Sequence, residues 1–206
     1  MLTDEHLALG RPLVEIVEEA IQGGATIIQY RAKDKAGGQM IKEALALLKV
    51  THRHQVPLII NDRIDVALAV DADGVHLGQE DIPCTLARKL MGPDKIIGIS
   101  ASSPATARQA EQNGANYLGV GAAFPTATKA DAGAAIGLEG LRTIRRIVKI
   151  PVVAIGGINI DNAAATAATG VAGLAVVSAV VAAPDPKQAA ATLKQAFLQG
   201  QSQLIS

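Results

Sequence analysis

The chain has 206 residues, which suits one domain over residues 1–206 with a sizeable buried core. Hydrophobic residues make up 49% of it, yet no apolar run approaches the roughly 20 residues of a membrane helix, and no basic segment followed by an apolar stretch opens the chain, so we expect neither a membrane span nor a signal peptide. Nineteen basic residues balance nineteen acidic ones, which disfavours nucleic-acid binding, and the single cysteine, Cys84, agrees with a reducing, cytoplasmic location.

Short β-branched runs alternate along the chain with longer segments of helical period. Strands are predicted at 25–30, 57–61, 73–77, 95–100, 116–121, 151–155 and 172–177. Helices are predicted at 11–22, 37–54, 63–70, 82–91, 104–113, 137–148, 159–169 and 185–198. Pro104 after Ser103 marks one helix start, and Asn159 or Asp161 could cap another. This alternation is typical of parallel βαβ units.

Strands and helices in these numbers can close as a barrel or open as a doubly wound sheet. The count favours an α/β fold, the (β/α)8 TIM barrel, whose first strand would be short and formed by Met1 to Asp4. In such a barrel the active site lies at the carboxyl ends of the strands. Polar or glycine residues follow nearly every predicted strand, which indicates one functional rim.

The residues predicted at this rim include cations and carboxylates. Arg31, Lys33 and Lys129 are suited to phosphate oxygens. Asp62 and Asp81 follow neighbouring strands and could share a Mg²⁺ ion, which takes one or two carboxylates and completes its shell with water and phosphate oxygens. The sequence therefore predicts a metal-bridged diphosphate site. The alternative is a set of salt bridges across the barrel mouth, in which Asp62 would cap a helix.

A second group of rim residues lacks charge. Gly156-Gly157 and Val177-Ser178 follow the last two predicted strands, where this fold commonly binds phosphate through backbone N–H groups. Glycine pairs also serve ordinary turns, so the pair alone is weak evidence. His76 lies inside a predicted strand, and we expect it to be a barrel-wall residue rather than a general base.

Together these motifs resemble thiamine-phosphate synthase, also called thiamine-phosphate pyrophosphorylase. The resemblance covers nearly the whole chain, although the family usually has a full first strand. It rests on Gln29-Tyr30-Arg31-Ala32-Lys33, Asn61-Asp62, Asp73 to Asp81, Phe124 to Lys129, and Ala154 to Ile158.

The resemblance implies a reaction and a set of site residues. The family joins 4-amino-5-hydroxymethyl-2-methylpyrimidine diphosphate to 4-methyl-5-(2-phosphoethyl)thiazole, and the products are thiamine phosphate and pyrophosphate. By position, Arg31, Lys33, Ser100 and Lys129 would be catalytic, and Asp62 and Asp81 would hold the Mg²⁺ cofactor. The implied substrate-binding residues are Gln29, Tyr30, Arg31, Ala32, Lys33, Asn61, Ser100, Thr126, Ala127, Thr128, Lys129, Gly157, Val177 and Ser178.

Two other functions share these features. A thiazole tautomerase of the same fold binds a thiazole phosphate carboxylate but releases no diphosphate, so Asp62, Asp81, Lys33 and Lys129 argue against it. A non-catalytic sensor would bind thiamine phosphate without turnover. The expected partners are phosphorylated small molecules, and a homo-oligomer is compatible with the sequence.

Overall fold

The computed structural model describes residues 1–126 and 134–204. Seven parallel strands form one sheet in the order β1 to β7, so each strand pairs with its neighbour in the chain. They are β1 (Ile28–Tyr30), β2 (Leu58–Asn61), β3 (Gly74–Leu77), β4 (Ile96–Ala101), β5 (Tyr117–Val120), β6 (Val152–Ile155) and β7 (Gly173–Ala175).

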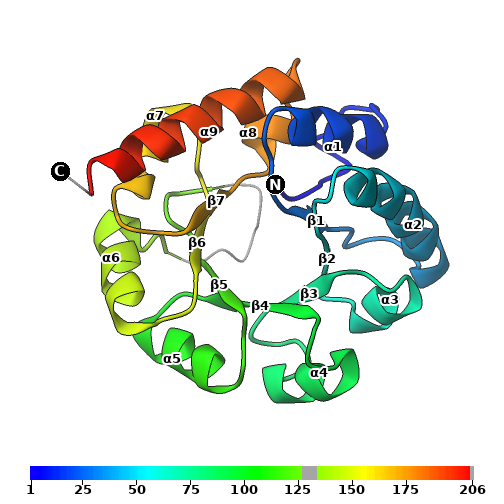
Figure 1. Cartoon of the computed structure of the whole chain (residues 1–206), viewed down its shortest axis with the longest axis horizontal. Helices are drawn as coiled ribbons and strands as arrows, with labels where there is room; N and C mark the ends of the chain where they lie inside the picture. The colour runs from blue at the N-terminus through cyan, green and yellow to red at the C-terminus, as the bar shows by residue number, and fades with distance from the viewer. Residues whose placement is uncertain (127–133, 205–206) are drawn as a thin grey trace.

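The helices alternate with the strands and lie outside the curled sheet (Figure 1). They are α1 (Leu13–Gln22), α2 (Gly37–Arg53), α3 (Ile64–Ala69), α4 (Cys84–Met91), α5 (Pro104–Gln112), α6 (Gly137–Ile147), α7 (Ile160–Ala167), α8 (Ser178–Val181) and α9 (Pro186–Ser202). The predicted order and type of these elements are confirmed, except that α8 was not predicted.

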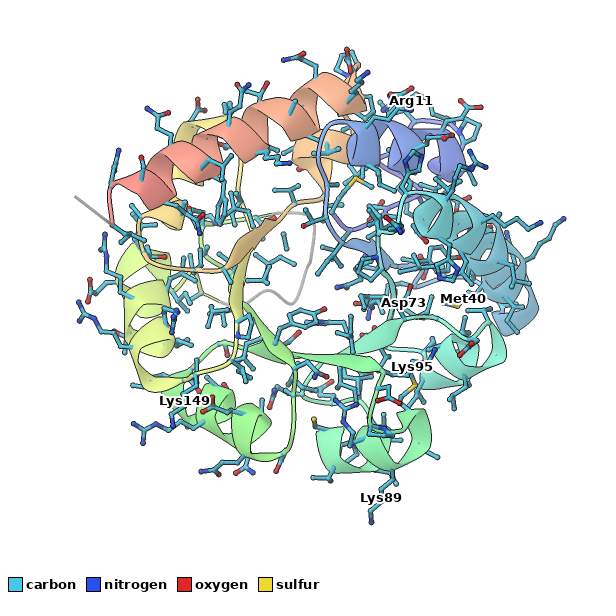
Figure 2. The ribbon with its side chains drawn as sticks, viewed as in Figure 1. Arg11, Met40, Asp73, Lys89, Lys95 and Lys149 are labelled. Atoms are coloured by element: carbon cyan, nitrogen blue, oxygen red, sulfur yellow. The ribbon has the colours of Figure 1, made fainter. Side chains whose placement is uncertain are left out.

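Local sequence explains where several helices begin. α5 begins at Pro104, and the Ser103 side chain accepts a hydrogen bond from the Thr106 amide. Asn159 caps α7 by accepting from the Asp161 amide at 2.9 Å, so of the two predicted caps Asn159 is the one used. Charged side chains such as Lys89 on α4 and Lys149 after α6 point outward to solvent (Figure 2).

The predicted strand at Met1 to Asp4 is not formed as a strand in the described chain. Leu2 makes only an isolated parallel bridge to Gln29 of β1. Its amide also donates to the Val176 carbonyl, just past β7, at 2.9 Å. The segment therefore lies between the two outer strands of the seven-stranded sheet, and α1 packs against α9 beside it (Figure 1).

Three strands end at a different residue from the prediction: β5 ends at Val120 rather than at residue 121, and the other two differences affect predicted site residues. β7 ends at Ala175 rather than at residue 177, because the chain turns at Val177 and the next residues form α8. Ser100 lies inside β4, which continues to Ala101. As a result, Ser100 projects from a strand, whereas Val177 and Ser178 lie at the start of a helix.

The main apolar core lies between the strands and the helix layer. Fully buried Ile28, Leu58 and Leu118 of the sheet belong to the same cluster as Met40 of α2 and Leu141 of α6. Met40 is labelled on α2 in Figure 2. This core holds the strand ends in fixed positions around one opening.

Candidate active site

A cavity of about 850 Å³ opens at the carboxyl ends of the strands. This is the face at which (β/α)8-type folds place their sites. Eleven of the residues predicted from sequence line it, namely Gln29, Arg31, Lys33, Asn61, Asp62, Asp81, Ser100, Thr126, Gly157, Val177 and Ser178. Groups that are far apart in the chain are thus brought to one opening.

Among the other predicted residues that the structure describes, Tyr30 and Ala32 do not line the cavity. The Tyr30 side chain is fully buried and points to the helix layer, where its hydroxyl donates to Glu43 at 2.7 Å. Ala32 is only partly buried and packs against the apolar core cluster. Ala127, Thr128 and Lys129 lie outside the described residues.

One side of the cavity, formed by Arg31, Lys33, Asp62 and Asp81, is called the charged side below. Lys33 Nζ lies 2.5 Å from Asp62 Oδ2, and Arg31 Nη1 lies 3.2 Å from Asp4 Oδ2. The Arg31 side chain is only 20% exposed, whereas that of Lys33 is 51% exposed. Arg31 is therefore held firmly, and Lys33 can reach into the cavity.

Asp62 and Asp81 are close enough to affect each other. Burial, with the neighbouring Asp62 carboxylate adding to it, raises the pKa of Asp81 above its ordinary value. Asp81 Oδ2 also accepts a hydrogen bond from the Gly78 amide at 2.7 Å. Asp62 itself has a left-handed backbone with φ of 62°, an uncommon conformation that directs its side chain from the end of β2.

The acidic pair has the chemistry of a small hard-cation site. Two adjacent carboxylates repel each other, and a divalent cation between them would relieve that repulsion. In the part of the chain that the structure describes, no cluster of three or more His, Cys, Asp or Glu side chains could hold a metal. Two carboxylates suffice for Mg²⁺ only where water and phosphate oxygens complete its shell.

Three polar side chains from neighbouring strands, His76, Ser100 and Tyr117, meet at the floor of the cavity. His76 of β3 is within 3.0 Å of the Tyr117 hydroxyl through Nδ1 and within 3.0 Å of Ser100 Oγ through Nε2. Burial raises the pKa of Tyr117, so its hydroxyl stays protonated and can donate to Nδ1. The two contacts of the His76 ring therefore connect Tyr117 of β5 to the Ser100 hydroxyl at the cavity floor.

Sequence analysis missed Tyr117, although two glycines give a signal for it. A Cβ atom at Gly98 would lie 2.2 Å from Tyr117 Cζ, and one at Gly119 would lie 2.8 Å from His76 Cε1. Glycine inside a strand often marks such a close approach. Gly98 of β4 and Gly119 of β5 thus leave the space that the two rings occupy.

The opposite side of the cavity, formed by Gly156, Gly157, Val177 and Ser178, is called the glycine side below. Gly156 and Gly157 both have positive φ, 98° and 64°. A Cβ atom at Gly157 would lie 2.6 Å from the Pro125 carbonyl oxygen. Val177 is the N-cap residue of α8 and Ser178 its first residue, so both are presented by a turn rather than by a strand.

The sequence of the chain matches a known family. A family model described as thiamine monophosphate synthase matches residues 1–180. The chain belongs to this family.

Relatives of the thiamine monophosphate synthase family cover most of the chain. Thiamine-phosphate synthase of Chloroflexus aurantiacus is 57% identical over 194 residues, which cover 94% of this chain and 89% of the relative. That of Moorella thermoacetica is 50% identical over 186 residues, covering 90% and 89%. The solved structure of thiamine phosphate pyrophosphorylase from Pyrococcus furiosus superposes with a TM-score of 0.89 at 48% identity, covering 97% of this chain and 94% of that one.

Proposed function

We propose that this chain is a transferase that condenses 4-amino-5-hydroxymethyl-2-methylpyrimidine diphosphate with 4-methyl-5-(2-phosphoethyl)thiazole. The products are thiamine phosphate and pyrophosphate. The observation that carries the proposal is one cavity that combines a charged side with a glycine side, in a chain of this family. Two chemically distinct sides suit two different phosphorylated substrates.

In the proposed reaction the bond between the pyrimidine methylene carbon and the diphosphate oxygen breaks first. The electron pair leaves with the diphosphate, and the thiazole nitrogen then donates its lone pair to form the new C–N bond. Arg31 and Lys33, assisted by Lys129, would bind the leaving diphosphate and stabilise its growing charge. No general base is needed, because the thiazole nitrogen is already a nucleophile.

Asp62 and Asp81 are the residues that would hold Mg²⁺. When bound, Mg²⁺ supplies positive charge next to the leaving diphosphate. The support for this assignment is the proximity of the two carboxylates and the raised pKa of Asp81, both typical of a pair suited to a cation.

The remaining assignments divide the two substrates between the two sides. Gln29, Asn61 and Ser100 would contact the pyrimidine substrate, because they line the cavity beside the charged side. Gly157, Val177 and Ser178, with Thr126, would bind the thiazole phosphate largely through backbone N–H groups. Holding both substrates in one cavity orients the nitrogen toward the methylene carbon.

Three broader points are part of the same proposal. Residues 1–4 would serve as the first strand of an eight-stranded barrel, which the hydrogen bonds of Leu2 to Val176 and of Thr3 to Gln29, each 2.9 Å, support. None of the helices in the described residues is long and apolar enough to span a membrane. A cytoplasmic location and a homo-oligomer remain proposals from the sequence.

The test is incubation with both substrates and Mg²⁺, followed by detection of thiamine phosphate and pyrophosphate. Omitting either substrate should abolish both products, and chelation of Mg²⁺ should do the same. A thiazole tautomerase would release no pyrophosphate, and a sensor would bind thiamine phosphate without forming either product.

A further inference from the structure

The segment that connects β1 to α2 is held against α2 by the carboxylate of Glu43, which binds a residue at each end of the segment. Tyr30, the last residue of β1, donates its hydroxyl hydrogen to Glu43 Oε2 at 2.7 Å. Lys35, two residues before α2 begins, lies 2.5 Å from Glu43 Oε1 through Nζ. Glu43 therefore fixes both ends of the short segment that carries Arg31 and Lys33.

The side chains of this segment point to two different places. Arg31 and Lys33 line the cavity, whereas Tyr30 and Lys35 point to the helix layer. The Lys35 side chain is only 10% exposed and that of Glu43 only 28% exposed. The contacts with Glu43 thus lie behind the cations, out of reach of a substrate in the cavity.

The charges around Glu43 keep this attachment ionic. Burial would raise the pKa of Glu43, but hydrogen bonds from Lys35 and Tyr30 outweigh burial and lower it. Lys35 also contacts Glu5 Oε2 at 2.8 Å, and the Gln39 side chain donates to Glu43 Oε1 at 3.2 Å. A partly buried and well-connected ion pair fixes geometry better than an exposed pair does.

We propose that Glu43 is a positioning residue for Arg31 and Lys33, holding these cations where the diphosphate binds. The inference rests on the proposed function, which assigns Arg31 and Lys33 to the diphosphate. A binding side chain is only as well placed as the residues that support it, and small displacements weaken both binding and catalysis.

The test is Glu43→Gln, which keeps the size of the side chain and removes its charge. We expect the Kd for inorganic pyrophosphate, measured by calorimetry with Mg²⁺ present, to rise about tenfold, the low end of the loss usual for a supporting residue. The KM for the pyrimidine diphosphate should rise by a similar factor. The KM for the thiazole phosphate should not change, because the glycine side has no contact with Glu43.

Glu18→Gln is the matched control. Glu18 is 33% exposed and pairs with Arg53 at 3.1 Å and His54 at 3.3 Å, near the other end of α2. It should alter the melting temperature about as much as Glu43→Gln does while leaving pyrophosphate binding unchanged. If Glu43→Gln failed to fold, Lys35→Met, which removes one of the two attachments, would carry the same test.

The outcomes separate the inference from the proposed function. Unchanged pyrophosphate binding in a folded Glu43→Gln variant, or an equal rise in both KM values, would overturn the positioning role alone. A wild-type protein that neither binds pyrophosphate nor forms thiamine phosphate would overturn the proposed function, and the positioning role with it. Weaker pyrophosphate binding with an unchanged KM for the thiazole phosphate supports the positioning role.

Discussion

The charged side and the glycine side of the cavity achieve anion binding by different means. On the charged side, the groups that act are side chains, and each is held by a partner, as Arg31 is by Asp4 and Lys33 by Asp62. On the glycine side, the described lining residues carry no charge, and the backbone conformation is what matters. Substitution on the charged side should therefore remove function without unfolding the protein. Substitution on the glycine side should disturb both function and folding.

The largest expected effect is on the charged side, from Asp81→Asn. Asparagine can still accept the hydrogen bond from the Gly78 amide, but the variant loses one formal charge from the proposed Mg²⁺ site. We expect turnover to fall roughly 100-fold, with only partial recovery at high Mg²⁺. The melting temperature should change little, because the substitution also removes repulsion from Asp62.

A Mg²⁺ titration of activity beside a thermal melt checks this prediction. Near-normal turnover with an unchanged Mg²⁺ requirement would exclude Asp81 as a ligand. A large drop in melting temperature would instead favour the salt-bridge interpretation of the barrel mouth.

The second prediction, Gly157→Ala, tests the glycine side. The added Cβ would lie 2.6 Å from the Pro125 carbonyl oxygen, and φ is 64°. We expect a loss of about 1–3 kcal/mol of stability from the backbone strain. We also expect a rise of about tenfold in the KM for the thiazole phosphate, because the strain displaces the backbone N–H groups.

Gly170→Ala is the matched control for that variant. Gly170 also has positive φ, 87°, but its added Cβ would come no closer than 3.8 Å to Arg145 Cγ. It should lower the melting temperature without changing either KM, as measured by steady-state kinetics. An equal rise in both KM values for Gly157→Ala would contradict the division of the cavity into two sides.

A smaller effect is expected from Asp4→Asn, which weakens the ion pair that holds Arg31. The Asp4 and Arg31 side chains are 11% and 20% exposed, so solvent screens the pair only in part. We expect the KM for the pyrimidine diphosphate to rise about fivefold, equivalent to about 1 kcal/mol. A KM that rises for the thiazole phosphate instead would show that Arg31 serves the other side.

The smallest expected effect is from Tyr117→Phe, beneath both sides. The change removes the hydroxyl that lies 3.0 Å from His76 Nδ1 and leaves that buried nitrogen without this partner. We expect a loss of about 1–2 kcal/mol in the free energy of unfolding, measured by urea denaturation, and a two- to threefold lower kcat, about 0.5 kcal/mol. A larger loss of kcat than of stability would indicate a direct role for the Ser100 hydroxyl in the reaction.

Much of the fold could be predicted because alternation of apolar strands and helices is a local property of the sequence. The end of β7 could not, since the apolar run from Leu174 to Val177 continues while the backbone turns. The helix α8 has the sequence Ser-Ala-Val-Val, and its two β-branched valines favour a strand in sequence-based prediction.

The candidate site was predictable in its membership more than in its geometry. Position at a strand end identified Arg31, Lys33, Asp62 and Asp81, which all line the cavity. The alternation of side chains along a strand could have shown that Tyr30 points away from Gln29 and Arg31. The pairing of Arg31 with Asp4 depends on the N-terminal segment lying beside β1, where the Thr3 amide donates to the Gln29 carbonyl, so no local pattern predicts it.

The chain that leaves β5 is tied down at both ends before it reaches α6. The Ala123 and Phe124 amides donate to the carbonyls of Ile155 and Gly156, at 2.8 and 3.0 Å, and the Ile136 and Gly137 amides donate back to Ala122 and Ala123, at 2.9 and 3.1 Å. These hydrogen bonds hold the two ends of the segment close together. The entropic cost of closing a connection between two fixed ends grows only slowly with its length. A change in the number of residues between Pro125 and Ala135 should therefore cost little stability, even where it removes residues proposed to bind the substrates.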